Sequence, residues 1–288
     1  GNGEARSYSL LNDQSETHRY VIAVLREAVS KGGSEWIHKA LKEGDILQSS
    51  PPSNKFPLAE GGEFSLLVAG GSGVTQLGLP GSAGVPDAAV ANTLVVPYNV
   101  VPRLDEQVAA VFVEPVAANM GVVAPAQGFL EGLRAECDRV GALLVFDEVI
   151  TGFRLGTGGA QQQFGVRADI TTFGKVIGGG LPIGAVGGRR DIMETLSPIG
   201  KVFHAGTLAG NPLATAAGRA ALSELTPEVY AALRRSAQRL SDVLTAAFDA
   251  AGVPATFPVV GTLVGMFFGD ALHGAAPTNF DDAKRTDE

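Results

Sequence analysis

Val145-Phe-Asp-Glu-Val-Ile-Thr-Gly-Phe153 is the stretch of sequence that decides the fold we expect. The apolar residues 142–146 predict a short, buried, parallel strand that ends at the acid Asp147. Residues 169–173 predict the next strand, and Lys175 lies just beyond its end. Ligands of open α/β sheets bind at the carboxyl ends of the strands. The sequence therefore predicts an α/β fold with an acid and an amine at neighbouring strand ends.

Asp147 and Lys175 have a chemistry that suits an aldehyde cofactor. A lysine among apolar and glycine residues is disfavoured as a charged ammonium, because burial removes its hydration. We therefore expect Lys175 to be either paired with an acid or neutral. A neutral amine can form an imine with an aldehyde, and an acid can hold a protonated pyridine nitrogen. The alternative is that Asp147 caps a helix and Lys175 is a solvated loop residue, and the two residues alone leave both interpretations open.

Four further motifs lie before and after this stretch. They are Val113-Glu-Pro-Val-Ala-Ala-Asn-Met-Gly121, Thr171-Thr-Phe-Gly-Lys-Val-Ile-Gly-Gly-Gly180, Gly187-Gly-Arg-Arg-Asp191 and Gly206-Thr-Leu-Ala-Gly-Asn-Pro212. With these motifs, residues 66–288 resemble the class III aminotransferases, and more closely the glutamate-1-semialdehyde 2,1-aminomutases. The resemblance implies an incomplete type I pyridoxal-phosphate-dependent large domain at residues 62–225. Residues 226–288 would then be the start of a truncated carboxyl-terminal small domain.

The resemblance also implies a cofactor, pyridoxal 5′-phosphate, and a role for each residue around it. Lys175 would form the imine, and Asp147 would pair with the pyridine nitrogen. Val149 would pack on the face of the ring, and Asn119 would hydrogen-bond the ring hydroxyl. The implied reaction is the isomerisation of glutamate-1-semialdehyde to 5-aminolevulinate in tetrapyrrole (porphyrin) biosynthesis.

A second subunit is implied by the loop that follows residue 205. Gly206 and Thr207 would reach the cofactor phosphate of the neighbouring subunit, so the resemblance implies a homodimer. Ser72 and Gly73 would belong to a lid over the small-molecule substrate. The family pattern has Tyr-Gln before Ala-Gly-Thr, whereas this chain has Phe203-His204. That difference removes a phenol hydroxyl near the cofactor and puts substrate handling in question.

Two family motifs do not occur among these 288 residues: a Ser-Gly-Thr-Glu-Ala phosphate loop and a Tyr-His-Gly segment that stacks on the pyridine ring. The strands around them would pair with those present here, so we expect unpaired sheet edges. Two alternatives to the aminomutase function therefore stay open. One is a related class III transaminase, in which the amino group leaves with the product. The other is an inactive fused fragment.

Residues 1–61 do not share the aminomutase pattern. Arg6-Ser-Tyr-Ser-Leu10 and Gly32-Gly-Ser-Glu-Trp-Ile-His38 resemble the flavin-binding barrel of ferredoxin-reductase-type oxygenase reductases. The resemblance implies that Arg6 binds the flavin phosphate, that Tyr8 and Ser9 lie along the ring, and that Gly33 and Ser34 donate to phosphate. A generic β-rich segment is the alternative. Because too few strands are present to close a barrel, we expect a partial β-barrel segment that does not retain flavin. A flavin-dependent reductase remains a further alternative function.

Composition limits the remaining classes of function. The net charge of −8 argues against nucleic-acid binding. The single cysteine, Cys137, excludes an internal disulfide and fits a reducing compartment. No apolar run approaches 18 residues, and the four histidines are scattered. We therefore expect a cytoplasmic protein with no membrane partner and no metal.

Hydrophobic periodicity predicts the other elements near the site. We expect helices at 127–140, 211–225 and 228–251, a short buried strand at 181–187 and a strand at 262–268. The expected apolar side of the first helix consists of Phe129, Leu130, Leu133, Cys137 and Val140. The expected apolar stripe of the last helix consists of Leu233, Leu240, Val243, Leu244 and Phe248.

Overall fold

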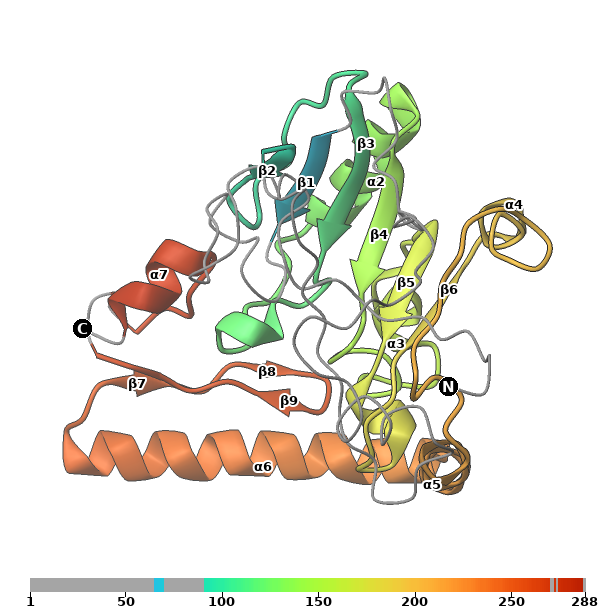
Figure 1. Ribbon diagram of the computed structural model, residues 1–288. Coiled ribbons are helices and arrows are strands. Elements are labelled where there is room, and N and C mark those ends of the chain that lie inside the picture. The colour runs from blue at the N-terminus through green and yellow to red at the C-terminus, as the bar shows by residue number, and fades with distance from the viewer. Residues whose placement is uncertain (1–64, 70–90, 270–271, 273, 287–288) are drawn as a thin grey trace, which may run out of the picture. The chain divides into compact units, whose positions relative to one another are not determined.

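The computed structural model describes residues 65–69, 91–269, 272 and 274–286 (Figure 1). The chain divides into two compact units, Gly1–Lys55 and Phe56–Glu288, and all described residues belong to the second. Several residues with expected roles lie outside the described part of the chain. They are Arg6, Tyr8, Ser9, Gly33 and Ser34 of the flavin-like segment, and Ser72 and Gly73 of the expected lid. Their roles stay predictions.

A mixed sheet forms the centre of the second unit, in the strand order β2-β1-β3-β4-β5-β6. The strands are β1 (Ser65–Ala69), β2 (Thr93–Val95), β3 (Val108–Val113), β4 (Leu143–Asp147), β5 (Ile170–Phe173) and β6 (Ala185–Gly188). All neighbours pair in parallel except β5 with β6. The predicted α/β fold and the two strands predicted on either side of the site, β4 and β5, are therefore confirmed.

Helices follow the strands in the alternating order typical of α/β domains. They are α2 (Phe129–Val140), α3 (Gly159–Phe164), α4 (Arg190–Met193), α5 (Pro212–Ser223), α6 (Pro227–Ala251) and α7 (Phe280–Arg285). Two 3₁₀ helices, η3 (Ala118–Met120) and η4 (Lys175–Gly178), follow the ends of β3 and β5. The three helices predicted from periodicity, α2, α5 and α6, are confirmed.

The main core lies between α2 and the middle of the sheet. Phe129, Leu130, Leu133 and Cys137 of α2 are all buried, and they belong to one cluster with the apolar residues of β3 and β4. Val140 is partly buried against the same cluster. The predicted apolar side of this helix is therefore confirmed. Its burial fixes the strands that carry the site, because close-packed interiors leave little freedom to shift.

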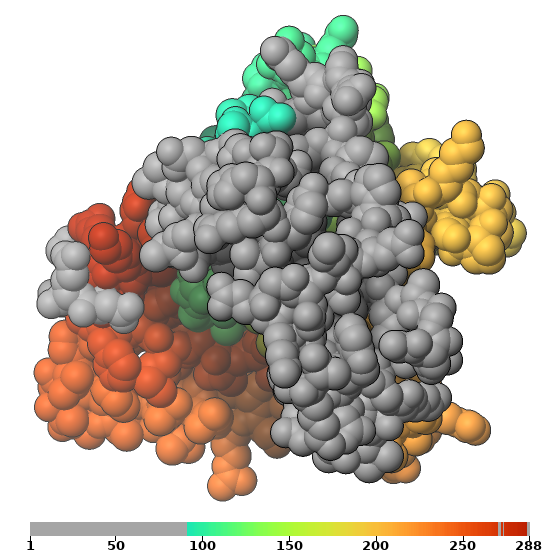
Figure 2. Space-filling model, in the orientation of Figure 1, coloured from blue at the N-terminus to red at the C-terminus, as the bar shows by residue number. Residues whose placement is uncertain are grey.

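The apolar stripe expected for α6 is wrong in part. Leu240 is 50% exposed and Val243 57% exposed, and Leu233 is exposed as well. The face that packs inward instead carries Tyr230 and Ser241, whose hydroxyls donate to backbone carbonyls at 2.7 and 2.6 Å. The helix therefore has two adjacent apolar sides, and periodicity alone does not show which one meets the domain. Part of α6 lies at the surface in the view of Figure 2 (orange).

The strand expected at 181–187 is shorter, later in sequence and more exposed than predicted. It is β6, the antiparallel edge of the sheet, and most of its residues are exposed. Leu181 and Val186 are both exposed to solvent. The apolar composition of the segment suggested a buried strand. The strand is exposed because an edge strand has a neighbour on one side only.

The strand expected at 262–268 is split into two. The small strands around the split are β7 (Ala255–Thr256), β8 (Val259–Val260), β9 (Leu263–Val264) and β10 (Phe267–Phe268). β9 pairs with β8, whereas β10 pairs with β7. Gly265, at the break, donates its N–H to Pro258 O at 2.8 Å, and a methyl group there would clash with Gly121 O. This close approach of two backbones is the reason for the break, and only glycine permits it.

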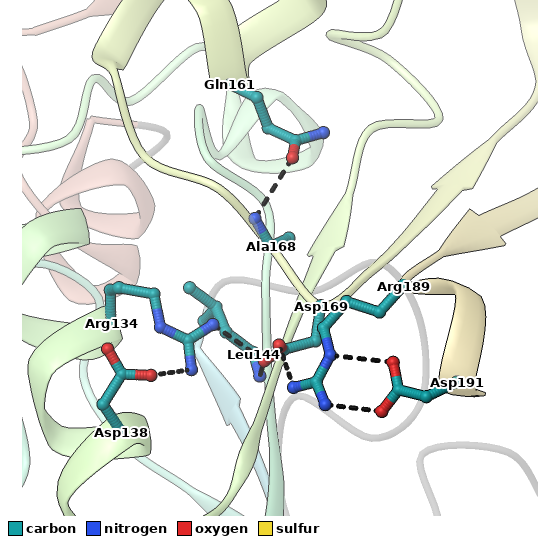
Figure 3. Close-up of polar contacts among 8 residues, drawn as sticks. All are labelled: Arg134, Asp138, Leu144, Gln161, Ala168, Asp169, Arg189 and Asp191. Atoms are coloured by element: carbon teal, nitrogen blue, oxygen red, sulfur yellow. Dashed lines mark hydrogen bonds and ion pairs between the residues drawn. The ribbon is translucent and has the colours of Figure 1, made fainter. Parts of the chain in front are cut away.

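An ion-pair network holds the sheet together at the end opposite the site (Figure 3). Asp169 precedes β5 and is buried. Its Oδ2 accepts from Arg134 Nη1 at 2.7 Å and from Leu144 N at 2.8 Å, and its Oδ1 accepts from Arg189 Nη1 at 2.9 Å. Arg189 also pairs with the exposed Asp191. One carboxylate thus joins α2, β4, β5 and the residue that follows β6.

This network sets the ionisation of Asp169. Burial opposes its ionisation, but hydrogen bonds from one backbone N–H and two guanidinium groups outweigh burial and lower the pKa of Asp169 below its usual value of 3.8. A carboxyl group with a lowered folded-state pKa stabilises the fold above its unfolded-state pKa. That contribution is lost as pH falls through the folded-state pKa.

We predict that Asp169→Asn lowers the free energy of unfolding by roughly 1.5–3 kcal/mol at pH 7, because buried hydrogen bonds to charged groups are lost. The difference from wild type should begin to shrink below about pH 4, where the unfolded chain takes up a proton at this carboxylate. It should vanish as pH falls through the lower pKa of Asp169 in the folded protein. Urea unfolding across this pH range measures both effects. Asp191→Asn, at an exposed pair, is the control and should change stability far less than Asp169→Asn. Equal effects of the two variants at pH 7 would contradict the network's importance.

Candidate active site

Asp147 ends β4 with its carboxylate already oriented. Its Oδ1 accepts from Val149 N at 3.1 Å and from the Thr172 hydroxyl on β5 at 3.2 Å. The register pairs Asp147 directly with Thr172. The side chain is half-buried. The predicted acid therefore lies at the carboxyl edge of the sheet, held from both its own loop and the neighbouring strand.

Lys175 begins η4, two residues after β5 ends. Its φ of +47° lies in the left-handed region, which costs roughly 1–2 kcal/mol for a residue with a Cβ. Such strain is concentrated at functional sites. The residue is exposed, so the apolar burial that the sequence favoured is not observed. The reason is local: the chain leaves the sheet at Gly174, and Lys175 lies beyond the covered strand end.

Val149 lies against the peptide that precedes this lysine. A methyl group at the buried Gly174 would come within 3.2 Å of Val149 Cγ1. The side chain of Val149 therefore occupies the space beside the backbone of residue 174. The valine, the acid and the lysine were predicted to share a site. They lie at, or just beyond, the neighbouring carboxyl ends of β4 and β5.

Asn119 reaches the same edge from β3, the strand on the other side of β4. It lies in η3 and is exposed. Its backbone N–H and that of Ala118 donate to Glu114 Oε2 at 3.3 and 3.1 Å. The short helix ends at Gly121, whose φ is +100°. Asn119 therefore lies in a turn before Gly121, and its contact with a cofactor hydroxyl stays a prediction.

Glu114 connects these residues electrostatically, and the sequence interpretation gave it no role. Burial raises the pKa of Glu114 from 4.5 to about 7. Among the smaller contributions, the charge of Asp147 adds to this rise and the charge of Lys175 opposes it. Asp147, Lys175 and Glu114 are therefore close enough to influence one another's charge. The sequence signal that could have identified Glu114 is an acid at the end of an apolar strand. Asp147 has the corresponding position at the end of β4.

Glu148 is the second residue that the sequence interpretation missed. It is 1% exposed, and its Oε2 accepts from the Thr151 hydroxyl at 3.1 Å and from Ala160 N at 2.7 Å. Its Oε1 accepts from Gln161 Nε2 at 3.1 Å. The same amide nitrogen lies 3.1 Å from the Thr171 hydroxyl of β5. Glu148 thus connects the loop after Asp147 to α3, and through α3 to the strand that leads to Lys175.

Gly206 and Thr207 lie in an exposed turn before α5, where Ala209 N donates to Gly206 O at 3.0 Å. An exposed position is what contact with a neighbouring subunit requires. Their expected role at a second cofactor stays a prediction. In the described part of the chain, no group of three His, Cys, Asp or Glu side chains is arranged to hold a metal ion. No helix described there is long and apolar enough to cross a membrane.

The family is decided by a match over most of the chain: residues 86–282 fit the model for class III aminotransferases. The chain belongs to the class III aminotransferase family. The fold prediction and the family resemblance of this part of the chain are thereby confirmed. The resemblance of residues 1–61 to flavin reductases stays a prediction.

The curated relatives of this chain include proteins named glutamate-1-semialdehyde 2,1-aminomutase. The protein from Desulfatibacillum aliphaticivorans is 51% identical over 232 residues, which cover 77% of this chain and 53% of that protein. The protein from Syntrophobacter fumaroxidans is 56% identical over 197 residues, covering 66% of this chain and 46% of that protein. The chain thus spans about half the length of the curated relatives it matches.

Solved structures of the family give the same fold. An omega-transaminase from Sphaerobacter thermophilus is 30% identical with a TM-score of 0.67, covering 77% of this chain and 56% of that one. A glutamate-1-semialdehyde-aminomutase variant from Pseudomonas aeruginosa PAO1, in complex with PMP, is 27% identical with a TM-score of 0.66. That match covers 78% of this chain and 55% of the Pseudomonas chain.

We predict that Glu148→Ala lowers the free energy of unfolding by roughly 2–3 kcal/mol, because it leaves buried donors on Thr151, Ala160 and Gln161 without their acceptor. Chemical unfolding at pH 7 measures the change. The exposed Glu131 of α2 provides the control, and Glu131→Gln should stay within about 0.5 kcal/mol of wild type. A Glu148→Ala variant as stable as this control would show that the loop after Asp147 does not depend on the carboxylate.

Proposed function

We propose that this chain serves the pyridoxal-phosphate-dependent isomerisation of glutamate-1-semialdehyde to 5-aminolevulinate. The observation that carries the proposal is the position of Asp147 and Lys175 at the carboxyl ends of two paired parallel strands. The identity of about 50% to proteins named for this reaction supports the choice of substrate.

The residues present fit the proposed cofactor. An amine lies in a strained backbone conformation beyond β5, and an oriented carboxylate lies on the paired strand. A second acid, Glu114, is buried near them with Oε1 lacking a hydrogen-bond partner among the described residues, and such groups cluster at functional sites. When bound, pyridoxal phosphate supplies an aldehyde and an electron-accepting pyridine ring.

Each residue would then have a role. Lys175 would hold the aldehyde carbon of the cofactor through Nζ, with loss of water, and its amine, once replaced by the substrate amine, would move a proton at the Cα of the substrate. Asp147 would hold a proton on the ring nitrogen, for which its half-buried, doubly hydrogen-bonded carboxylate is suited. Val149, already packed beside Gly174, would support one face of the ring. Asn119 would donate to the ring hydroxyl from η3.

We also propose a homodimer in which Gly206 and Thr207 bind the phosphate of the neighbouring subunit's cofactor. The support is the exposure of large apolar side chains beside this loop in sequence. Leu208 is 63% exposed and Leu213 is 73% exposed. Exposed large apolar side chains are a feature of interaction sites.

A class III transaminase is the second candidate, because solved transaminases share the fold at 30% identity or more. This chain has Phe203-His204 where the family pattern has Tyr-Gln, just before Gly206 and Thr207. The missing phenol hydroxyl bears on which of the two reactions the site carries out. The two reactions differ in their need for a second substrate. Formation of 5-aminolevulinate from glutamate-1-semialdehyde alone supports the aminomutase, whereas a strict requirement for a separate amino donor supports the transaminase.

We predict that pyridoxal phosphate attaches to Lys175 and to no other lysine. Borohydride reduction followed by peptide mapping should find the pyridoxyl label on the peptide that contains Lys175. Lys175→Ala should abolish the label, whereas the exposed Lys201→Ala should retain it. A stoichiometric label elsewhere in the wild-type chain would refute the assignment.

We predict that Leu213→Asp converts a dimer into a monomer, because it places a charge on the apolar surface next to Gly206 and Thr207. The variant should remain folded, since an acid in the first turn of α5 interacts favourably with the helix dipole. Light scattering coupled to size-exclusion chromatography measures the mass. Val243→Asp, on the exposed side of α6, is the control and should remain dimeric. A wild-type monomer, or a Leu213→Asp dimer, would contradict the proposed interface.

A further inference from the structure

Glu114 follows β3 directly and turns back onto the segment that carries Asn119. The side chain is 3% exposed. Its Oε2 accepts the N–H groups of Ala118 and Asn119 at 3.1 and 3.3 Å. These are the first N–H groups of η3, which have no partner inside the helix itself. Ala118 N also donates to Val116 O, outside the helix, at 2.8 Å. The carboxyl group therefore acts chiefly on Asn119, whose N–H it accepts.

The base of the same loop is fixed independently of Glu114. Ala117 and Val123 exchange two backbone hydrogen bonds, each 3.0 Å long. Gly121 then closes η3 through its N–H to Ala118 O at 3.3 Å. Without the carboxyl group, the loop would keep its base, and Ala118 would keep the hydrogen bond from its N–H to Val116 O at 2.8 Å. The Asn119 N–H would lose its acceptor. A substitution at Glu114 should therefore change the orientation of Asn119 more than it changes the stability of the domain.

The surroundings of Glu114 explain how a carboxyl group can remain there. Asp147 and Lys175 interact with it from β4 and η4, and Tyr98 interacts with it from the segment before β3. The Tyr98 hydroxyl is itself committed to Pro115 O at 3.0 Å. Because burial raises the pKa of Glu114 to about 7, a large fraction is protonated near neutral pH. A proton on the unpartnered Oε1 removes most of the cost of a buried charge.

We propose that Glu114 is a positioning residue of the active site: it holds η3 so that the Asn119 side chain meets the ring hydroxyl of the cofactor. This inference rests on the proposed function, because it needs pyridoxal phosphate at Lys175. In this role Glu114 does not need to touch the cofactor or the substrate. It acts through Asn119 alone, and this route separates it from a residue that merely stabilises the domain.

A cofactor analogue tests this route directly. Pyridoxal phosphate and 3-deoxypyridoxal phosphate, which lacks the ring hydroxyl, are titrated into wild type, Glu114→Ala, Asn119→Ala and the double variant. Glu114→Ala should weaken binding of pyridoxal phosphate roughly 5–10-fold, about the worth of one hydrogen bond. It should leave binding of the deoxy analogue unchanged. The double variant should bind pyridoxal phosphate no more weakly than Asn119→Ala.

Two further variants protect the test against unfolding. Glu114→Gln keeps an acceptor for the two N–H groups and should bind pyridoxal phosphate like wild type. Glu114→Asp keeps a carboxyl group but is one methylene too short to reach them, and should behave like Glu114→Ala. Thermal melting of the cofactor-free variants confirms that each is folded before titration.

The outcomes separate the two proposals. If wild type carries the label at Lys175, but Glu114→Ala weakens both cofactors equally or adds to Asn119→Ala, the positioning role is overturned and the proposed function stands. If wild type binds no pyridoxal phosphate at Lys175, the proposed function fails, and the role of Glu114 fails with it.

Discussion

The parallel pairing of β4 with β5 is the constraint on which the site depends. Parallel neighbours end at the same edge of a sheet, so residues just beyond the two strands must meet there. The register places Asp147 beside Thr172, and Glu148 N continues the pairing to Thr172 O at 3.0 Å. A slip by one residue would turn Asp147 to the other face of the sheet. Lys175 and Asp147 can cooperate only while this register holds.

Buried carboxyl groups fix that register from several directions. Asp169 ties the opposite ends of β4 and β5 to α2 and to the arginine after β6 (Figure 3). Glu148 holds the loop after β4 to α3, and Glu114 does the same for the loop after β3. Each accepts at least one backbone N–H from another part of the chain: Leu144 N in β4, Ala160 N in α3, or Ala118 N in η3. The site is therefore supported by acids that take no part in the chemistry we propose.

Much of this arrangement could be predicted from the sequence, and the rest could not for physical reasons. Apolar runs that end in an acid or precede a lysine predicted β4, β5 and the edge at which Asp147 and Lys175 lie. Periodicity predicted α2 and its buried face. It was wrong in part for α6, where Leu240 and Val243 are exposed and tertiary contacts bury the side with Tyr230 and Ser241. The roles of Glu114 and Glu148 depend on hydrogen bonds to loops that a linear pattern does not reveal.

The central claim is that Asp147 and Lys175 act on one cofactor from two strand ends. The most direct measurement is the ¹⁵N NMR shift of ring-labelled pyridoxal phosphate bound at saturating concentration, compared between wild type and Asp147→Asn. The account predicts a protonated ring nitrogen in wild type from pH 6 to 9, and an unprotonated one in the variant that still attaches to Lys175. The same shift in both proteins would contradict it, because the acid on β4 would then not face the cofactor held from β5.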